Sequence, residues 1–126
     1  MTATQDYQFP KRDYIYDATM VAVTDGDTVK LDLDLGLDVG VRIDCRLNGI
    51  NAKGKRTVEG KKAMAFLQEL YPVGEQVRVE TFRDKTEKYG RYLVVLHHER
   101  LDDTVNNVMV KQGLVEPYYG VGKAAD

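Results

Sequence analysis

The segment VRIDCRLNGI, residues 41–50, decides the fold class. In residues 41–48 every second side chain is apolar, and the side chains between them are polar. The apolar set is Val41, Ile43, Cys45 and Leu47. Because successive side chains of a β-strand point to opposite faces, this alternation predicts a half-buried strand with Arg46 on its polar face.

The segment before it, ATMVAVTDGDTVKLDL (residues 18–33), carries β-branched residues on both sides of Asp25-Gly26-Asp27. Asp and Gly favour tight turns, so this segment predicts a β-hairpin. A second turn is expected at LGLDVG (35–40), which contains two glycines. The first half of the chain therefore predicts three consecutive strands.

The segment after it, TVEGKKAMAFLQELYPVG (57–74), predicts a helix with Thr57 as its N-cap and Pro72 and Gly74 at its end. One apolar face follows helical spacing. That face consists of Ala63, Phe66, Leu67, Leu70 and Tyr71.

Two more strands are expected in EQVRVETF (75–82) and RYLVVLHH (91–98), joined by the charged loop 83–90. A short helix follows in residues 102–113, with Asp103 or Thr104 as its cap and Gly113 as its stop. The last segment, LVEPYYGVGKAAD (114–126), has no clear period and predicts no element.

Five short strands with a helix after the third predict a mainly β, α+β fold: a small, partly open barrel of the OB type. We expect an N-terminal arm at residues 1–13, one domain at 14–119 and a C-terminal tail at 120–126. A chain of 126 residues suits one such domain.

The composition is ordinary for a water-soluble protein, with 43% hydrophobic and 30% charged residues. The N-terminal residues are polar, and no apolar run is long enough to span a bilayer, so we expect a cytoplasmic protein without membrane contact. The single cysteine, Cys45, fits a reducing compartment and is expected in the core. The net charge of −2 argues against strong non-specific binding of nucleic acid, although basic residues cluster at 53–62 and 83–91.

Five motifs in order give the chain a resemblance to staphylococcal-nuclease-like domains, over about residues 17–119. The motifs are DGDTVKL (25–31), RLNGINA (46–52), EGKKAMAFL (59–67), KYGR (88–91) and VNNVMVKQGLVEPYY (105–119). The compact, bacteriophage-type versions are more similar than the secreted enzymes. The resemblance implies the OB barrel of the staphylococcal nuclease type and a Ca²⁺-dependent hydrolysis of DNA and RNA.

The resemblance also implies roles for individual residues. Asp27 matches a metal-ligand aspartate, and Asp25 matches an acid behind it. Arg46 and Arg91 match two arginines that stabilise the charge on a phosphate. From the residues alone, a plain hairpin turn at 25–27 and two solvated arginines are the alternatives.

Further positions match residues that touch the ligand. Lys88 and Tyr89 match phosphate contacts, and Tyr119, with Tyr118 beside it, matches a tyrosine that contacts a base. A packing role for these tyrosines is the alternative. The adjacent pair His97-His98 is interpreted as an exposed turn and not a metal site, because no further ligand is near it in the sequence.

The hexapeptide GINAKG (49–54) departs from the family pattern Gly-Ile-Asp-Ala-Pro-Glu. Asn51 stands where a second carboxylate ligand belongs, and Ala52 keeps a position that uses only its backbone carbonyl. Lys53 replaces proline and puts a cation beside the metal position. Gly54 replaces the glutamate that acts as general base. Loss of a general base typically lowers a rate about 10²- to 10⁴-fold.

We therefore expect an inactive or very weak nuclease with a weak or lost Ca²⁺ site, in which Lys53, Arg46 and Arg91 hold a nucleotide, another phosphate or a short single strand. One alternative is an active Ca²⁺-dependent nuclease in which Glu87 or Glu59 replaces the missing carboxylate. The other is a structural module of a phage particle, either as a homo-oligomer or with phage structural proteins, located in the host cytoplasm or the virion.

Overall fold

The hairpin predicted around Asp25-Gly26-Asp27 consists of β1 (Tyr14–Asp25) and β2 (Thr28–Asp34). The alternating segment that follows is β3 (Gly40–Leu47), antiparallel to β2. This computed structural model describes residues 14–83 and 92–118, except for the side chain of Arg83. The remaining segments contain Arg91, Lys88, Tyr89, Tyr119 and Glu87, so the roles predicted for those residues lie outside the described part.

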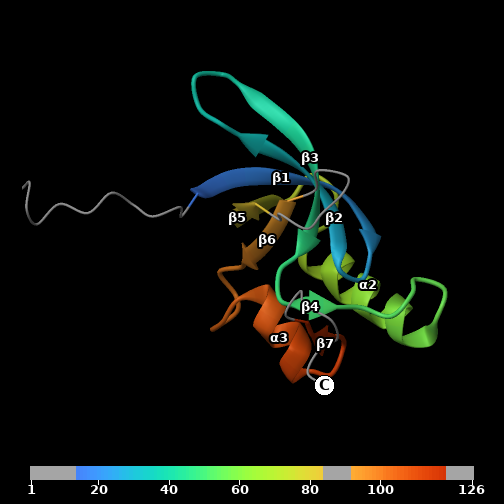
Figure 1. Cartoon of the computed structure of the whole chain (residues 1–126). Coiled ribbons are helices and arrows are strands. Elements are labelled where there is room, and N and C mark those ends of the chain that lie inside the picture. Colours follow the sequence, from blue (N-terminus) through green and yellow to red (C-terminus); the bar gives the residue numbers. More distant parts are fainter. Residues whose placement is uncertain (1–13, 84–91, 119–126) are drawn as a thin grey trace, which may run out of the picture.

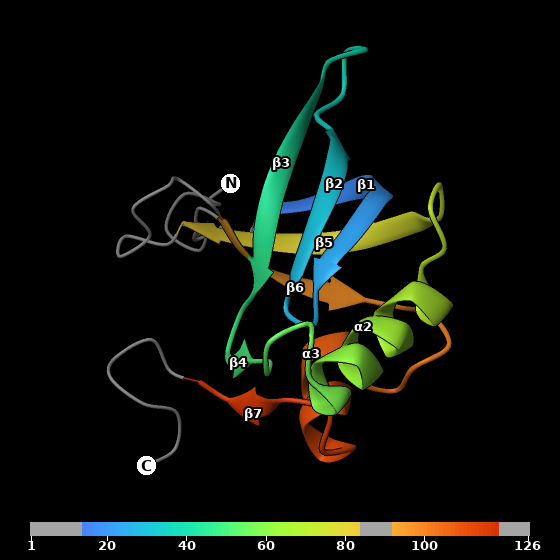
Figure 2. The same cartoon turned by 90° about the vertical axis from the view of Figure 1, so that its right-hand side faces the viewer.

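The sheet closes into a barrel because β3 meets β6 (Tyr92–His97) in parallel, while β5 (Gln76–Arg83) joins β6 to β1. The strand order is β1-β2-β3-β6-β5, and β1 returns to β5. This is the order of an OB barrel, so the predicted fold class, a mainly β α+β fold with an OB-like barrel, is confirmed. Figures 1 and 2 show the barrel from two sides.

Helix α2 (Val58–Leu70) begins where predicted, since the hydroxyl of its N-cap Thr57 accepts from the Gly60 N–H. Helix α3 (Val105–Lys111) begins at Thr104 in the same way. Both figures place these two helices at one end of the barrel and the β2–β3 turn at the other.

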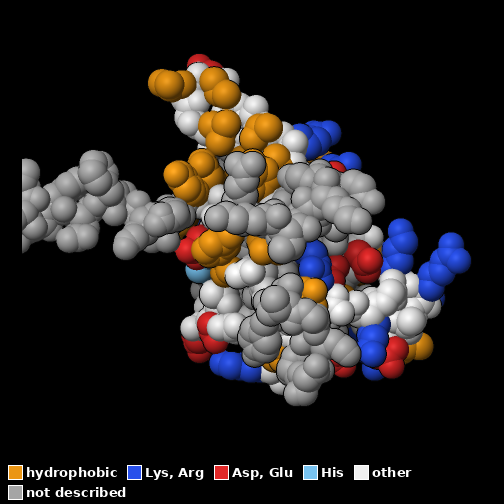
Figure 3. Space-filling view, in the orientation of Figure 1, with side chains coloured by type: hydrophobic (Ala, Val, Ile, Leu, Met, Phe, Trp, Pro, Cys, Tyr) orange, Lys and Arg blue, Asp and Glu red, His pale blue; other side chains and the backbone are white. Residues whose placement is uncertain are grey.

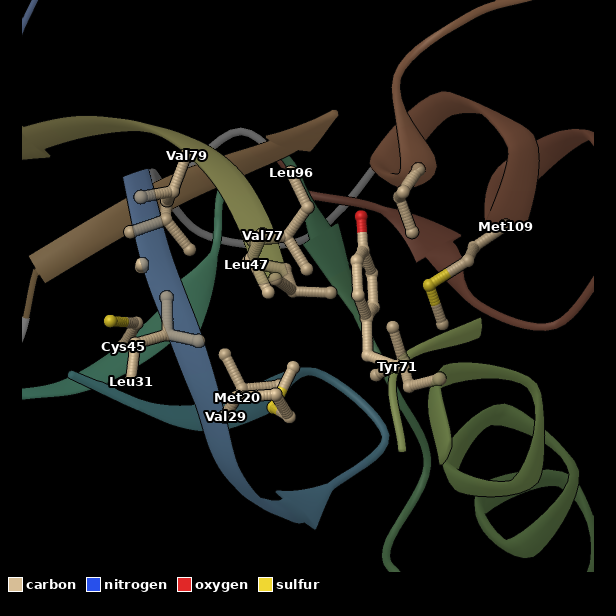
Figure 4. Close-up of a cluster of buried hydrophobic side chains, with 14 of the residues drawn as sticks. Met20, Val29, Leu31, Cys45, Leu47, Tyr71, Val77, Val79, Leu96 and Met109 are labelled. Carbon is tan, nitrogen blue, oxygen red and sulfur yellow. The ribbon is translucent and has the colours of Figure 1, made fainter. Parts of the chain in front are cut away.

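The core fills the barrel and continues down to the helices. Figure 4 shows Met20, Leu31 and Val79 inside the barrel, and Tyr71 between the barrel and α3. The ring of Tyr71 is 1% exposed, and its hydroxyl donates to the carbonyl of His97 over 3.1 Å. Tyr71 thereby ties the end of α2 to the end of β6.

The inward face of β3 is buried only at one end. Cys45 and Leu47 are buried, whereas Val41 is 42% exposed. The β2–β3 hairpin projects beyond the barrel, so its apolar side chains continue the core pattern into solvent (Figure 3). The exposed ones are Leu35, Leu37, Val39 and Val41.

Two short strands were not predicted. β4 (Ile50–Asn51) pairs with β7 (Glu116–Pro117) in an antiparallel sheet of its own. The expectation that residues 114–126 contain no element is therefore wrong for residues 116–117. This pairing brings the segment after α3 against the segment GINAKG.

Candidate functional site

The β1–β2 turn lies close against the segment that leads into α2. A Cβ atom on Gly26 would lie 2.8 Å from the Cβ of Ala52 and 2.8 Å from that of Ala63. Glycine is therefore required at position 26 for this approach. The contact fixes Asp27 beside the end of β4.

Asp27 is 8% exposed and uses both carboxylate oxygens inside the protein. Oδ2 accepts from the N–H of Ala52 over 3.0 Å, and Oδ1 accepts from the hydroxyl of Thr28 over 3.0 Å. Its backbone carbonyl accepts from the N–H of Leu47. Asp27 thus joins the start of β2, the end of β3 and the segment after β4.

Arg46 lies next to Asp27, and its side chain is 21% exposed. Nη2 donates to Oδ1 of Asn51 over 2.9 Å and to the carbonyl of Ile50 over 3.4 Å. Its distance to Oδ2 of Asp27 is 3.7 Å. The structure therefore brings together three of the predicted site residues, Asp27, Arg46 and Asn51.

Tyr118 covers one side of this arginine. The Arg46 guanidinium carbon lies 5.0 Å from the centre of the Tyr118 ring. The N–H of Tyr118 donates to the carbonyl of Gly49 over 2.8 Å, which holds the chain after β7 in place. A cation over an aromatic face contributes about 0.5–1 kcal/mol at an exposed site.

The side chain of Lys53, in the segment after β4, lies near Glu116 of β7. Its Nζ lies 4.0 Å from Oε2 of Glu116, and both side chains are more than half exposed, at 59% and 63%. Such a surface pair contributes little. No hydrogen bond or ion pair in the described part joins Lys53 to Asp27 or Arg46, so occupation of the metal position by its ammonium stays a prediction.

The remaining predicted positions have local contacts. Oδ1 of Asp25 accepts from the N–H of Gly26 over 2.7 Å, as in a plain turn. Gly54 brings no side chain, and its carbonyl accepts from both the hydroxyl and the N–H of Thr57. Glu59 is exposed in the first turn of α2.

The described donor set does not fit a Ca²⁺ ion, which takes six to eight oxygen ligands. Asp27 already accepts from Ala52 and Thr28, and Oδ1 of Asn51 accepts from Arg46. The described residues contain no group of three His, Cys, Asp or Glu side chains that could hold a metal.

Cys45 and the histidines lie apart from this cluster. Burial, with a smaller contribution from Asp44, raises the pKa of the Cys45 thiol to about 12, and the side chain is fully buried. His98 packs edge-on against Tyr71 with ring centres 5.1 Å apart. Nε2 of His97 lies 3.5 Å from Oε1 of Glu80. Both histidines are half-buried, and the N–H of Leu101 donates to the carbonyl of His98, so the predicted turn is present but the two side chains are not fully exposed.

Sequence reasoning missed Glu116 and the stacking of Tyr118 on Arg46. Glu116 lies directly opposite Asn51 in the β4–β7 register. No periodicity marks a two-residue strand, and only the proline after Glu116 indicates extended backbone. A depression of about 380 Å³ between α2 and the segment after α3 contains none of the residues around Arg46.

A scan against protein-family models and a search of the curated proteins found no match to the chain. Of the helices in residues 14–83 and 92–118, none combines the length and hydrophobicity that crossing a membrane requires. The OB-like barrel therefore rests on the structure, and membership of a family does not follow from these comparisons.

Proposed function

We propose that the chain is a staphylococcal-nuclease-like domain that binds the phosphate of a nucleotide or of a short nucleic-acid strand and hydrolyses it very slowly or not at all. Two observations support this: the resemblance carried by the five motifs, and the cluster of Asp27, Asn51 and Tyr118 around Arg46. The bacteriophage-type resemblance makes the host cytoplasm or the virion the expected location.

The observation that carries the proposal is the way Arg46 is held. Its two hydrogen bonds go to the neutral oxygens of Asn51 and Ile50. Among the described residues, one carboxylate, that of Asp27, lies within 4.0 Å of the guanidinium, and it is 3.7 Å away. The arginine thus has one ion pair, at 3.7 Å with Asp27, while its hydrogen bonds within the described residues go from Nη2 to neutral oxygens, which leaves its other N–H groups able to donate to an anion.

Loss of hydrolysis is expected because two chemical parts are missing. Gly54 offers no general base, which lowers the rate by about 10² to 10⁴. Asn51 offers an uncharged oxygen where a cation needs a carboxylate. Both changes act on catalysis and leave the arginine in place.

The test is hydrolysis of single-stranded DNA with Ca²⁺ by the native protein and by a variant with Asn51→Asp, Lys53→Pro and Gly54→Glu. A Cβ on Gly54 meets no atom within 4 Å, so Glu fits there. We expect cleavage by the variant alone. Equal cleavage by the native protein would sink the proposal and favour a substitute carboxylate, with Glu59, Glu87 and Glu116 as the candidates for Glu→Gln variants.

A second candidate function, an interaction module, is favoured by the projecting β2–β3 hairpin. Leu37 is 95% exposed and Val39 is 53% exposed at its tip. Exposed apolar side chains that cluster often mark an interface. Light scattering tests this function. For an interaction module that self-associates, we expect the native protein to have a mass above that of one chain, and the double variant Leu37→Ser with Val39→Ser to have the mass of one chain. A single-chain mass at all concentrations contradicts self-association.

A further inference from the structure

Five basic residues gather between β4 and the second turn of α2. They are Lys53, Lys55, Arg56, Lys61 and Lys62, and all are exposed. One acidic residue, Glu59, lies among them in a chain whose net charge is −2. Figure 3 shows blue side chains gathered on the right, where Figure 1 places the connection from β4 to α2. We call these five residues the basic turn.

The centre of the basic turn is held firmly. The N–H and the hydroxyl of Thr57 both donate to the carbonyl of Gly54, over 2.9 and 2.7 Å. The N–H of Gly60 donates to the hydroxyl of Thr57 over 2.9 Å. These bonds make Gly54–Thr57 a closed turn with Lys55 and Arg56 at its two central positions.

Backbone packing reinforces this turn. A Cβ on Gly60 would lie 2.0 Å from the carbonyl oxygen of Gly54, so the first turn of α2 lies directly against the Gly54 backbone. The two central cations are therefore presented by a fixed backbone. Binding an anion there costs less ordering entropy than binding it on a loose segment.

The basic turn also differs in its partners from four cations elsewhere on the molecule. Lys30, Arg42, Arg78 and Lys111 each lie within 4.0 Å of an aspartate carboxylate. In the described part of the chain, no carboxylate lies that close to the four cations of the basic turn other than Lys53. Exposed cations that have no carboxylate partner and lie on a well-fixed backbone attract an extended anion.

The basic turn follows Arg46 along the chain. Asn51, which holds Arg46, is four residues before Lys55, so their backbones are at most about 13 Å apart at about 3.3 Å per residue. We propose that the basic turn is a second phosphate-contacting surface for single-stranded nucleic acid, adjoining Arg46, so that the ligand is a strand of several nucleotides. This inference rests on the proposed function.

A strand fits these observations better than an anionic membrane. A membrane-bound surface combines basic residues with apolar side chains that enter the interface. The basic turn has one exposed large apolar neighbour, Val58. A nucleic-acid strand needs cations along its backbone and aromatic rings for its bases, and Tyr118 lies at Arg46.

The experiment measures fluorescence anisotropy of labelled dT2 and dT12 with EDTA present, over salt concentrations from about 25 to about 200 mM. The test variant is Lys55→Gln with Arg56→Gln. The matched control, Lys30→Gln with Arg78→Gln, removes the same charges from the barrel wall. A third variant, Arg46→Gln, tests the first site.

We expect the native protein to bind dT12 more than tenfold tighter than dT2. The test variant should bind dT12 about tenfold more weakly than the native protein does and dT2 almost equally well. The slope of its log affinity for dT12 against log salt concentration should be smaller in magnitude by about 1.4, since each of the two lost phosphate contacts contributes about 0.7. The matched control should stay within about twofold of the native protein.

Other outcomes separate this inference from the proposed function. If Arg46→Gln weakens dT12 binding and the test variant does not, the basic turn has no such role and the proposed function stands. If the native protein binds neither oligonucleotide, both fail. A third outcome is that the native protein does not bind dT12 but binds vesicles of phosphatidylcholine with about one third phosphatidylserine, and that the test variant does not bind these vesicles. The ligand of the basic turn would then be an anionic membrane and not a nucleic-acid strand.

Discussion

Nη2 of Arg46 donates to Oδ1 of Asn51 over 2.9 Å, so an uncharged side chain holds the arginine. Asparagine offers Arg46 a hydrogen bond without a charge. Aspartate at the same position would form an ion pair and compete with any bound anion. The side chain at position 51 therefore bears on anion affinity.

Asn51→Asp should weaken binding of dT2 by about tenfold when EDTA is present, because the new carboxylate neutralises Arg46. Titration calorimetry measures the change. Gln68→Glu adds the same charge on an exposed position of α2 and is the control. Equal affinity in native protein and Asn51→Asp would show that Arg46 does not contact the ligand.

Gly60→Ala should destabilise the protein by about 1–3 kcal/mol, since its Cβ would overlap the Gly54 carbonyl. The sign is informative, because alanine in place of glycine within a helix ordinarily stabilises by about 1 kcal/mol. Gly54→Ala is the control, with nothing within 4 Å of its Cβ. Urea unfolding of both variants decides, and a stabilised Gly60→Ala would disprove the close contact at the turn.

The barrel was predictable from sequence because its strands and helices repeat a pattern over several residues. Alternation in residues 41–47 and helical spacing in residues 57–71 each give several independent positions. The helix cap Thr57 was predictable from the side-chain chemistry that an N-cap needs, and the cap of α3 was narrowed to Asp103 or Thr104, of which the structure has Thr104. These local signals agree with the fold, which is why they sufficed.

The surroundings of Arg46 were only partly predictable. Its place on the polar face of β3 follows from alternation, but its contacts come from Ile50 and Asn51 in the connection after β3 and from Asp27 and Tyr118, which are remote in sequence. A pairing of two residues with two others produces no period. The alternation also continues through Val41, past the point where the barrel ends. The sequence pattern of one strand does not show how far the neighbouring strands of the sheet extend.

Asn106→Ala should cost about 2–4 kcal/mol of unfolding free energy, since Asn106 is 3% exposed and fully hydrogen-bonded. Its Oδ1 accepts from the N–H of Leu96, and its Nδ2 donates to the carbonyls of Asn48 and Val94. Truncation removes the partner of the buried N–H of Leu96, whereas the carbonyl of Val94 keeps the N–H of Asn48. Asn107→Ala on the exposed side of α3 is the control, and equal losses in both would contradict a special role for Asn106.

Asp103 should titrate with a pKa of about 2, because its carboxylate accepts hydrogen bonds from Lys111, then Asn107, then the backbone of Thr104. A lowered folded-state pKa stabilises above the unfolded value near 3.8, and this contribution is lost as the pH falls through about 2. The hydrogen bonds of Asp103 to Asn107 and Lys111 of α3 should therefore weaken between about pH 4 and about pH 2.

Carboxyl-detected NMR of Asp103 measures this titration. Lys111→Gln should raise the Asp103 pKa toward its ordinary value, since it removes the largest cause of the shift. Lys30→Gln removes a lysine from the distant barrel wall and should leave the titration unchanged. An Asp103 midpoint that Lys111→Gln does not move would show that the ion pair does not persist in solution.

The tip of the β2–β3 hairpin should gain stability from residues suited to its backbone. Leu37 and Asp38 have φ of 56° and 61°, and the N–H of Val39 donates to the carbonyl of Gly36, as in a type I′ turn. Left-handed backbone costs a residue such as leucine about 1–2 kcal/mol, and Asn-Gly is the pair that such turns prefer. Leu37→Asn with Asp38→Gly should raise the unfolding free energy by about 1 kcal/mol. Urea unfolding measures it, with Val73→Asn as a control for loss of an exposed apolar side chain. An unchanged midpoint would mean that the projecting tip opens before the barrel unfolds, because strain relieved in a segment that is already open does not affect the global transition.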